Sequence, residues 1–130
     1  MEPTIITIYV TIKDDYRPKL VLELLDGHVD NLEIDLHGII VLPKNQTYHA
    51  RILSIQDGKE QELGQFPIEN EPFANIGLSN MGGSEIQISI TLSKVFANTF
   101  SEYKMEILSE GKVVASNKTI LFFSGDITNE

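Results

Sequence analysis

The sequence contains no cysteine, so disulfide bonds, thiolate metal ligands and a cysteine nucleophile are all excluded. It also lacks tryptophan and has only four tyrosines, which argues against the aromatic-lined sugar cleft of a glycosidase. No run approaches the ~18 consecutive apolar residues of a membrane-spanning helix. The first apolar stretch, residues 5–12, is too short and too rich in threonine for a signal peptide. We therefore expect a cytoplasmic protein or a phage virion component.

Basic residues are scarce as well, with 10 lysines and arginines against 19 aspartates and glutamates and a formal net charge of -9. Nucleic acids and anionic membranes bind through clustered basic side chains, so neither is an expected partner. Solubility alone explains such acidity. The functional interpretation is attraction of a basic partner or a cation.

What the sequence does have is a period of two. Apolar and polar residues alternate in residues 4–12, 32–36 and 86–92, a pattern that predicts half-buried strands. Strand signals recur about every 8 to 12 residues with glycine or proline between them, as is typical of sandwiches and barrels. No stretch keeps helical spacing over ten residues. We predict a single all-β domain over residues 1–130, a sandwich of about eight or nine strands, with a small β-barrel as the alternative.

Local signals refine this prediction. Asp57-Gly58 and Glu110-Gly111 are turn signals between strands. Pro67 marks its strand as an edge strand, because proline cannot donate to a ladder. Gly38 interrupts an apolar pattern, which predicts a bulge or a bend. Residues 94–99 are less regular and compatible with a single helical turn.

The last third of the chain carries a family pattern. Residues 100–108 read Phe-Ser-Glu-Tyr-Lys-Met-Glu-Ile-Leu, and a Glu-Gly-Lys turn leads to Val-Val-Ala-Ser at 113–116. This resembles the final hairpin of immunoglobulin-like sandwich domains, in particular an uncharacterised bacterial and phage branch, and residues 47–59 fit an earlier strand and turn. The resemblance covers about half of the chain and implies an immunoglobulin-like antiparallel β-sandwich. It gives Tyr103 the place of the corner tyrosine, whose hydroxyl bonds to upstream backbone.

The sequence departs from that family in two respects. Ser101 and Glu102 stand where a glycine usually precedes the tyrosine. The cysteine pair and the core tryptophan of antibody domains are absent. Since this fold hosts many functions, the resemblance implies no activity.

One cluster of potential metal ligands lies in the first third of the chain. The candidate ligands are His28, Glu33, Asp35 and His37, of which the last three project from one face of a strand. Carboxylates and imidazoles together can hold a divalent cation. The spacing matches no metal-loop template, however, and a solvated strand face is the simpler interpretation. We predict neither metal nor cofactor. No Gly-x-Ser-x-Gly elbow is present, and we predict no enzyme activity.

Two segments, 39–42 and 120–123, are apolar at every position. A sandwich strand that is apolar on both faces needs a cover on its outer side. That cover is either the chain itself, for example residues 94–99, or a second copy or another protein. We assign the interface to Ile40, Leu42, Leu121 and Phe123.

These observations together predict a non-enzymatic protein-interaction or structural module of bacterial or phage origin. Burial of an outer apolar patch would supply its binding energy, and acidic loops would select the partner. A protein partner or self-association is expected. Two alternatives stay open: a small β-barrel that binds an apolar small ligand, and a divalent-metal site on the acidic and histidine-bearing strand face.

Overall fold

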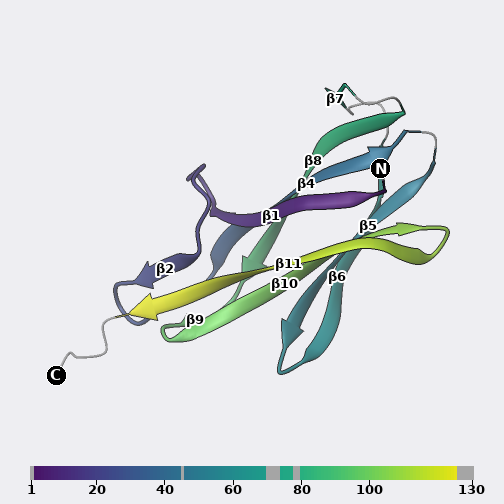
Figure 1. The fold of residues 1–130 in the computed structure, drawn as a ribbon. Helices are drawn as coiled ribbons and strands as arrows, with labels where there is room; N and C mark the ends of the chain where they lie inside the picture. Colours follow the sequence, from purple (N-terminus) through teal and green to yellow (C-terminus); the bar gives the residue numbers. More distant parts are fainter. Residues whose placement is uncertain (1, 45, 70–73, 78–79, 126–130) are drawn as a thin grey trace.

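The computed structural model describes residues 2–44, 46–69, 74–77 and 80–125 (Figure 1). These residues form strands and connecting turns, and they include no helix of the length and apolar character needed to cross a bilayer. The strands are β1 (Thr4–Ile12), β2 (Val21–Leu24), β3 (His28–Val29), β4 (Leu32–Pro43), β5 (Tyr48–Gln56), β6 (Lys59–Ile68), β7 (Ala74–Asn75), β8 (Met81–Leu92), β9 (Val95–Phe96), β10 (Thr99–Ser109) and β11 (Lys112–Gly125).

The strands build two main sheets that face each other. One has the order β1-β4-β8-β7 and the other β2-β11-β10-β5-β6, while β3 and β9 form a separate short pair. The predicted sandwich is confirmed, and because the sheets stay separate the β-barrel alternative is wrong. Alternation in the sequence correctly predicted β1, β4 and β8, whereas the two-residue strands β3 and β9 are too short to show a period. All pairs are antiparallel except β2 with β11, which run parallel.

The chain changes sheets between β1 and β2. At this crossing the Lys19 backbone N–H donates to the Val10 carbonyl at 2.8 Å. The Asp15 carboxylate accepts from the backbone and the guanidinium of Arg17, each at 3.1 Å, and pairs with Lys19. The hydrogen bonds from Arg17 hold the pKa of Asp15 well below its usual range. Contacts among side chains of this loop therefore stabilise the conformation of the connection between β1 and β2.

An Asp15→Asn variant should make stability less sensitive to acid. Unfolded aspartates titrate near 3.9, so the lowered pKa of Asp15 stabilises the folded state above about pH 4 and this contribution is lost as the pH falls further. In thermal melts of wild type and variant, taken from about pH 7 to about pH 2, the gap between the two melting temperatures should therefore narrow in acid. The same gap between the two melting temperatures at every pH would contradict the idea.

The predicted hairpin turns are confirmed. Asp57 and Gly58 have φ of 52° and 78°, and Glu110 and Gly111 have the same pair of values. Two successive positive φ angles define the type I′ turn that matches the twist of a hairpin. The strand that contains Pro67 is an edge strand, as predicted. The helical turn considered for residues 94–99 is wrong, because β9 pairs there with β3.

The core lies between the sheets and follows the alternation of the strands. On β4 the inward residues include Ile34, Leu36, Ile40 and Leu42, all fully buried. The facing sheet contributes side chains that are equally buried: Tyr48, Ile52, Met105, Ile107 and Leu121. The two sheets also meet at one side of the sandwich, where β1 and β11 lie next to each other (Figure 1). There the Asn117 amide on β11 donates to the Ile5 carbonyl on β1 at 3.4 Å.

Of the bulge or bend predicted at Gly38, the bulge is wrong. The register of β4 with both neighbours runs through Gly38, and the register shift lies in β1 between Ile5 and Thr7. Gly38 faces the interior, where a Cβ would collide with the thioether of Met105. A glycine is required here because a core side chain from the opposite sheet approaches the backbone closely.

Candidate functional site

The four residues assigned to an interface lie in the core instead. Ile40, Leu42 and Leu121 are 0% exposed and Phe123 is 2% exposed, so they cannot form an outer patch. The physical reason is that successive side chains of a strand point to opposite faces, so the assignment depends on which alternate set points inward. A run of four apolar residues shows that both faces of a strand are apolar, but it does not show which pair faces the solvent.

The outer face of β4 is covered by the chain itself at one end. Val41 faces outward there, yet it is almost fully buried. Its neighbour in register on β8 is Gly83, and the Ile76 side chain lies 3.1 Å from where a Cβ of Gly83 would be. Of the two covers expected for an apolar outer face, the chain itself or a partner, the chain itself covers this end of β4.

The outer face of β11 is different, because an apolar patch stays open there. Phe122 lies beside Phe100 on β10 and beside Val21 on β2 in the strand register. We call these three residues the aromatic row. Their exposed fractions are 42% for Phe122, 57% for Phe100 and 49% for Val21. The two phenyl rings are tilted by 49° with centroids 6.0 Å apart, a favourable aromatic contact.

An acidic hollow adjoins the aromatic row. It is an open depression of about 510 Å³ between the β5–β6 turn and the start of β10. Its lining residues are Ile55, Gln56, Asp57, Gly58, Asn98, Thr99, Phe100 and Glu102. The Phe100 ring thus forms a wall of a depression that also carries two carboxylates. A cationic side chain placed there could contact the ring and one of the carboxylates together.

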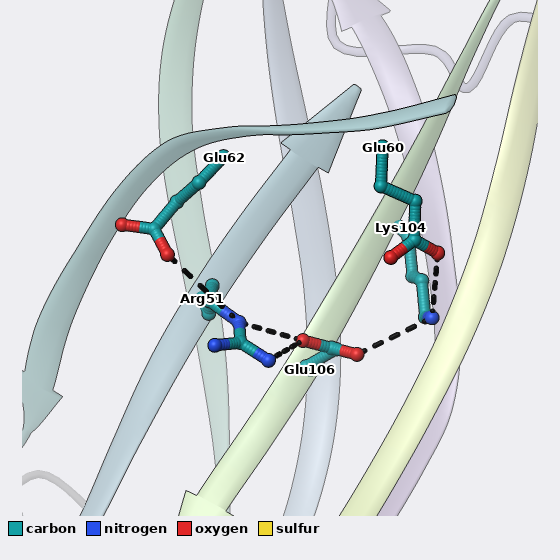
Figure 2. Close-up of polar contacts among 5 residues, drawn as sticks. All are labelled: Arg51, Glu60, Glu62, Lys104 and Glu106. Carbon is teal, nitrogen blue, oxygen red and sulfur yellow. Dashed lines mark hydrogen bonds and ion pairs between the residues drawn. The ribbon is translucent and has the colours of Figure 1, made fainter. Parts of the chain in front are cut away.

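Farther along the same outer face lies a network of five charged side chains (Figure 2). Glu106 on β10 is 5% exposed, and its carboxylate binds Arg51 at 2.6 Å and Lys104 at 3.3 Å. Glu62 and Glu60 on β6 pair with the same two cations. The hydrogen bond from Lys104 lowers the pKa of Glu60. Every charge in the network has a partner, and the ion pairs connect β10 to both β5 and β6.

The predicted acidic and histidine-bearing face belongs to the other sheet. Leu32, Ile34 and Leu36 are buried there, as expected for the opposite face of β4. Glu33 pairs with Lys13 at 2.7 Å, and Asp35 accepts from the Ser89 hydroxyl at 2.7 Å. Each carboxylate thus has its own partner.

The His37 ring is held by three neighbours. It stacks parallel to Tyr9 with centroids 4.6 Å apart, and its nitrogens contact the Thr11 hydroxyl at 2.8 Å and the Glu85 carboxylate at 2.9 Å. An Nδ1–H that donates to Glu85 leaves Nε2 to accept from Thr11. Burial and the same carboxylate raise the pKa of the Tyr9 phenol. Both ring nitrogens of His37 are therefore occupied by hydrogen bonds within the sheet.

The four metal-ligand candidates are not brought together. Glu33, Asp35 and His37 share one face of β4, but His28 lies on β3 against the ring of Phe96. Over the part of the chain that the structure describes, no three histidine, aspartate or glutamate side chains converge as a metal site would require.

Tyr103, the residue matched to the corner tyrosine, is buried in the middle of β10. Burial raises the pKa of its phenol, and a hydrogen bond with the Ser101 side chain opposes that rise. Ser101, two residues before Tyr103 on the same strand, thus supplies a polar contact for this phenol.

No protein-family model and no curated protein matches the sequence. Solved structures are nevertheless similar in fold. A bacterial adhesin from Mobiluncus mulieris matches 95% of this chain with a TM-score of 0.58 at 10% identity, and the match spans 58% of the adhesin chain. A glycosyl hydrolase family 2 member from Bacteroides cellulosilyticus matches 91% with a TM-score of 0.56 at 9% identity, over only 15% of its own chain.

The C-terminal domain of wzt matches 96% of this chain with a TM-score of 0.50 at 13% identity, over 75% of that chain. At such low identities the likeness concerns the fold and not the activity. The chain is an all-β, immunoglobulin-like sandwich.

Proposed function

We propose that this chain is a non-enzymatic protein-interaction module and that the aromatic row is its binding surface. The observation that carries the proposal is the register that places Val21, Phe122 and Phe100 side by side and exposed. Contiguous exposed aromatic and aliphatic side chains are the usual anchors of protein interfaces. The adhesin domain among the similar structures is compatible with a binding role.

The charge of the surface indicates the kind of partner. Asp57 and Glu102 border the row at the acidic hollow, and the whole chain has a net charge of -9. A partner that presents an apolar side chain to the row and a lysine or arginine to the hollow satisfies both features. An acidic partner would be repelled. The module therefore selects a basic, apolar protein surface.

Two peptides of equal length test this specificity, one alternating arginine with leucine and the other glutamate with leucine. The arginine peptide should shift the amide NMR signals of Phe100 and Phe122 in isotope-labelled protein, and added salt should weaken its binding. The glutamate peptide should not bind. Shifts confined to another face would overturn the assignment of the surface.

A Phe122→Asp variant should raise the dissociation constant for the arginine peptide at least about tenfold, because it removes a central anchor. The side chain is partly exposed, so the fold should persist, as circular dichroism can verify. Val113→Asp is the matched control, since Val113 is an exposed apolar residue at the other end of β11. Equal binding by wild type and Phe122→Asp would contradict the proposal.

A further inference from the structure

Strand β8 has one edge that the described part of the chain leaves largely unpaired. On one side β8 pairs with β4 from Met81 to Leu92. On its other side the described residues pair only at Gly82 and Gly83, with β7. The backbone from Gln87 to Leu92 thus presents a row of N–H and C=O groups along this edge, a template for another strand.

The other sheet edges carry protection that this one lacks. Edge strand β6 has several charges, a register shift at Leu63 and a proline at position 67. Edge strand β1 contains a register shift and is covered by Asn117 and Lys19, which donate to its carbonyls. Edge strand β2 has only four residues. Bulges, charges, proline and short length are the known means of blocking edge-to-edge pairing.

The segment 87–92, which reads Gln-Ile-Ser-Ile-Thr-Leu, has none of these devices. It contains no charge, proline or glycine, and its register with β4 is unbroken. Ile88, Ile90 and Leu92 pack against the core but are only partly buried. Ile90 and Leu92 line an open hollow of about 160 Å³ together with Leu63 of the facing sheet. The apolar side of this edge is therefore incompletely covered.

We propose that this edge pairs with the same edge of a second copy of the chain. The two segments would run antiparallel about a two-fold axis at Ile90, with Ile90 opposite Ile90, Ile88 opposite Leu92 and Ser89 opposite Thr91. Apolar residues then face apolar residues on the core side, and uncharged polar residues face each other on the outer side.

Charge favours a second copy as the occupant. The chain has a net charge of -9, so most of its surface repels its own kind, yet the paired stretch contains no carboxylate. A two-fold pairing through this stretch therefore brings two uncharged strand edges together. It also closes on itself and therefore gives a dimer without open-ended growth. Each dimer would carry two aromatic rows.

Because the sequence contains no cysteine, a single introduced cysteine is the only thiol that can form a disulfide in a cross-linking test. Directly opposite residues of paired strands have Cβ atoms about 4.5–5.5 Å apart, close to the separation in a disulfide. An Ile90→Cys variant should therefore form a disulfide-linked dimer under mild oxidation. Thr91→Cys, the matched control from the same strand, should not. An equimolar mixture of Ser89→Cys and Thr91→Cys should form the mixed dimer.

Light scattering and sedimentation of the unmodified chain provide the second measurement. The mass should rise toward that of a dimer as the concentration approaches about 1 mM. Ile90→Lys, which opposes two like charges at the axis, should stay monomeric if it folds; if it does not fold, the cysteine variants decide. The proposal is overturned if the unmodified chain stays strictly monomeric and Ile90→Cys cross-links no faster than Thr91→Cys. The same result is expected if a different protein, and not a second copy, pairs with this edge, so that alternative also contradicts the proposal. Phe122→Asp should dimerise normally, so this test is independent of the aromatic row.

Discussion

A Gly38→Val variant should lose about 3 kcal/mol of its free energy of unfolding, the upper part of the range for overpacked cores. The first new carbon would already collide with the thioether of Met105. That thioether is the flexible end of its side chain, but Met105 is fully buried, so it can move only by displacing other core groups. Urea unfolding of the two proteins measures the loss.

A second substitution identifies the cause. Met105→Ala alone should cost about 2–5 kcal/mol because it leaves a cavity. In combination with Gly38→Val the new methyl groups fill part of that cavity, so the double variant should lose at least about 1 kcal/mol less than the sum of the single losses. Gly64→Val is the control: a Cβ there meets nothing within 4 Å, and the change should stay within about 0.5 kcal/mol. Additive losses would refute the collision.

Much of the fold was predictable from the sequence because alternation and turn chemistry are local. The period of two in residues 86–92 predicted a strand, and Asp57-Gly58 predicted a hairpin turn that the φ angles confirm. Residues 32–36 gave the correct inner and outer sets for β4. Each of these predictions needs only the residues of one strand or one turn.

The binding surface could not be located in the same way, because it depends on strand order and parity. Val21 reaches Phe122 only through a parallel pairing between strands that are distant in sequence. The segment 120–123 is apolar throughout, so nothing local distinguishes the exposed Phe122 from the buried Phe123. The cover for this strand, from within the chain or from a partner, remains a prediction, whereas the residues assigned to the interface were the wrong set.

The charged network was missed for the same physical reason. Arg51, Glu62 and Glu106 lie on three different strands, and the sequence shows them only as ordinary surface charges. Only the register of β5 with β10 places Arg51 directly opposite Glu106. A polar residue at an outward position predicts exposure, but the neighbouring side chains leave Glu106 only 5% exposed.

An Arg51→Ala variant should therefore lose about 2 kcal/mol of its free energy of unfolding. The guanidinium binds one carboxylate oxygen of Glu106 through both Nη2 and Nε, at 2.6 and 2.7 Å (Figure 2). Removing it leaves that oxygen of a nearly buried carboxylate without its charged donors. Lys104 still holds the other oxygen, so the loss should fall below the 3–5 kcal/mol of a fully buried pair.

Two comparisons make this prediction specific. Lys13→Ala breaks an ion pair with Glu33 of similar length, 2.7 Å, but both side chains are about half exposed, so it should cost much less than Arg51→Ala. The double variant Arg51→Met with Glu106→Leu removes both charges and fills their space, so it should recover most of the loss from Arg51→Ala. If Arg51→Ala and Lys13→Ala cost the same, burial of Glu106 does not govern the energy of the network, and the five charges act only as solvated surface groups.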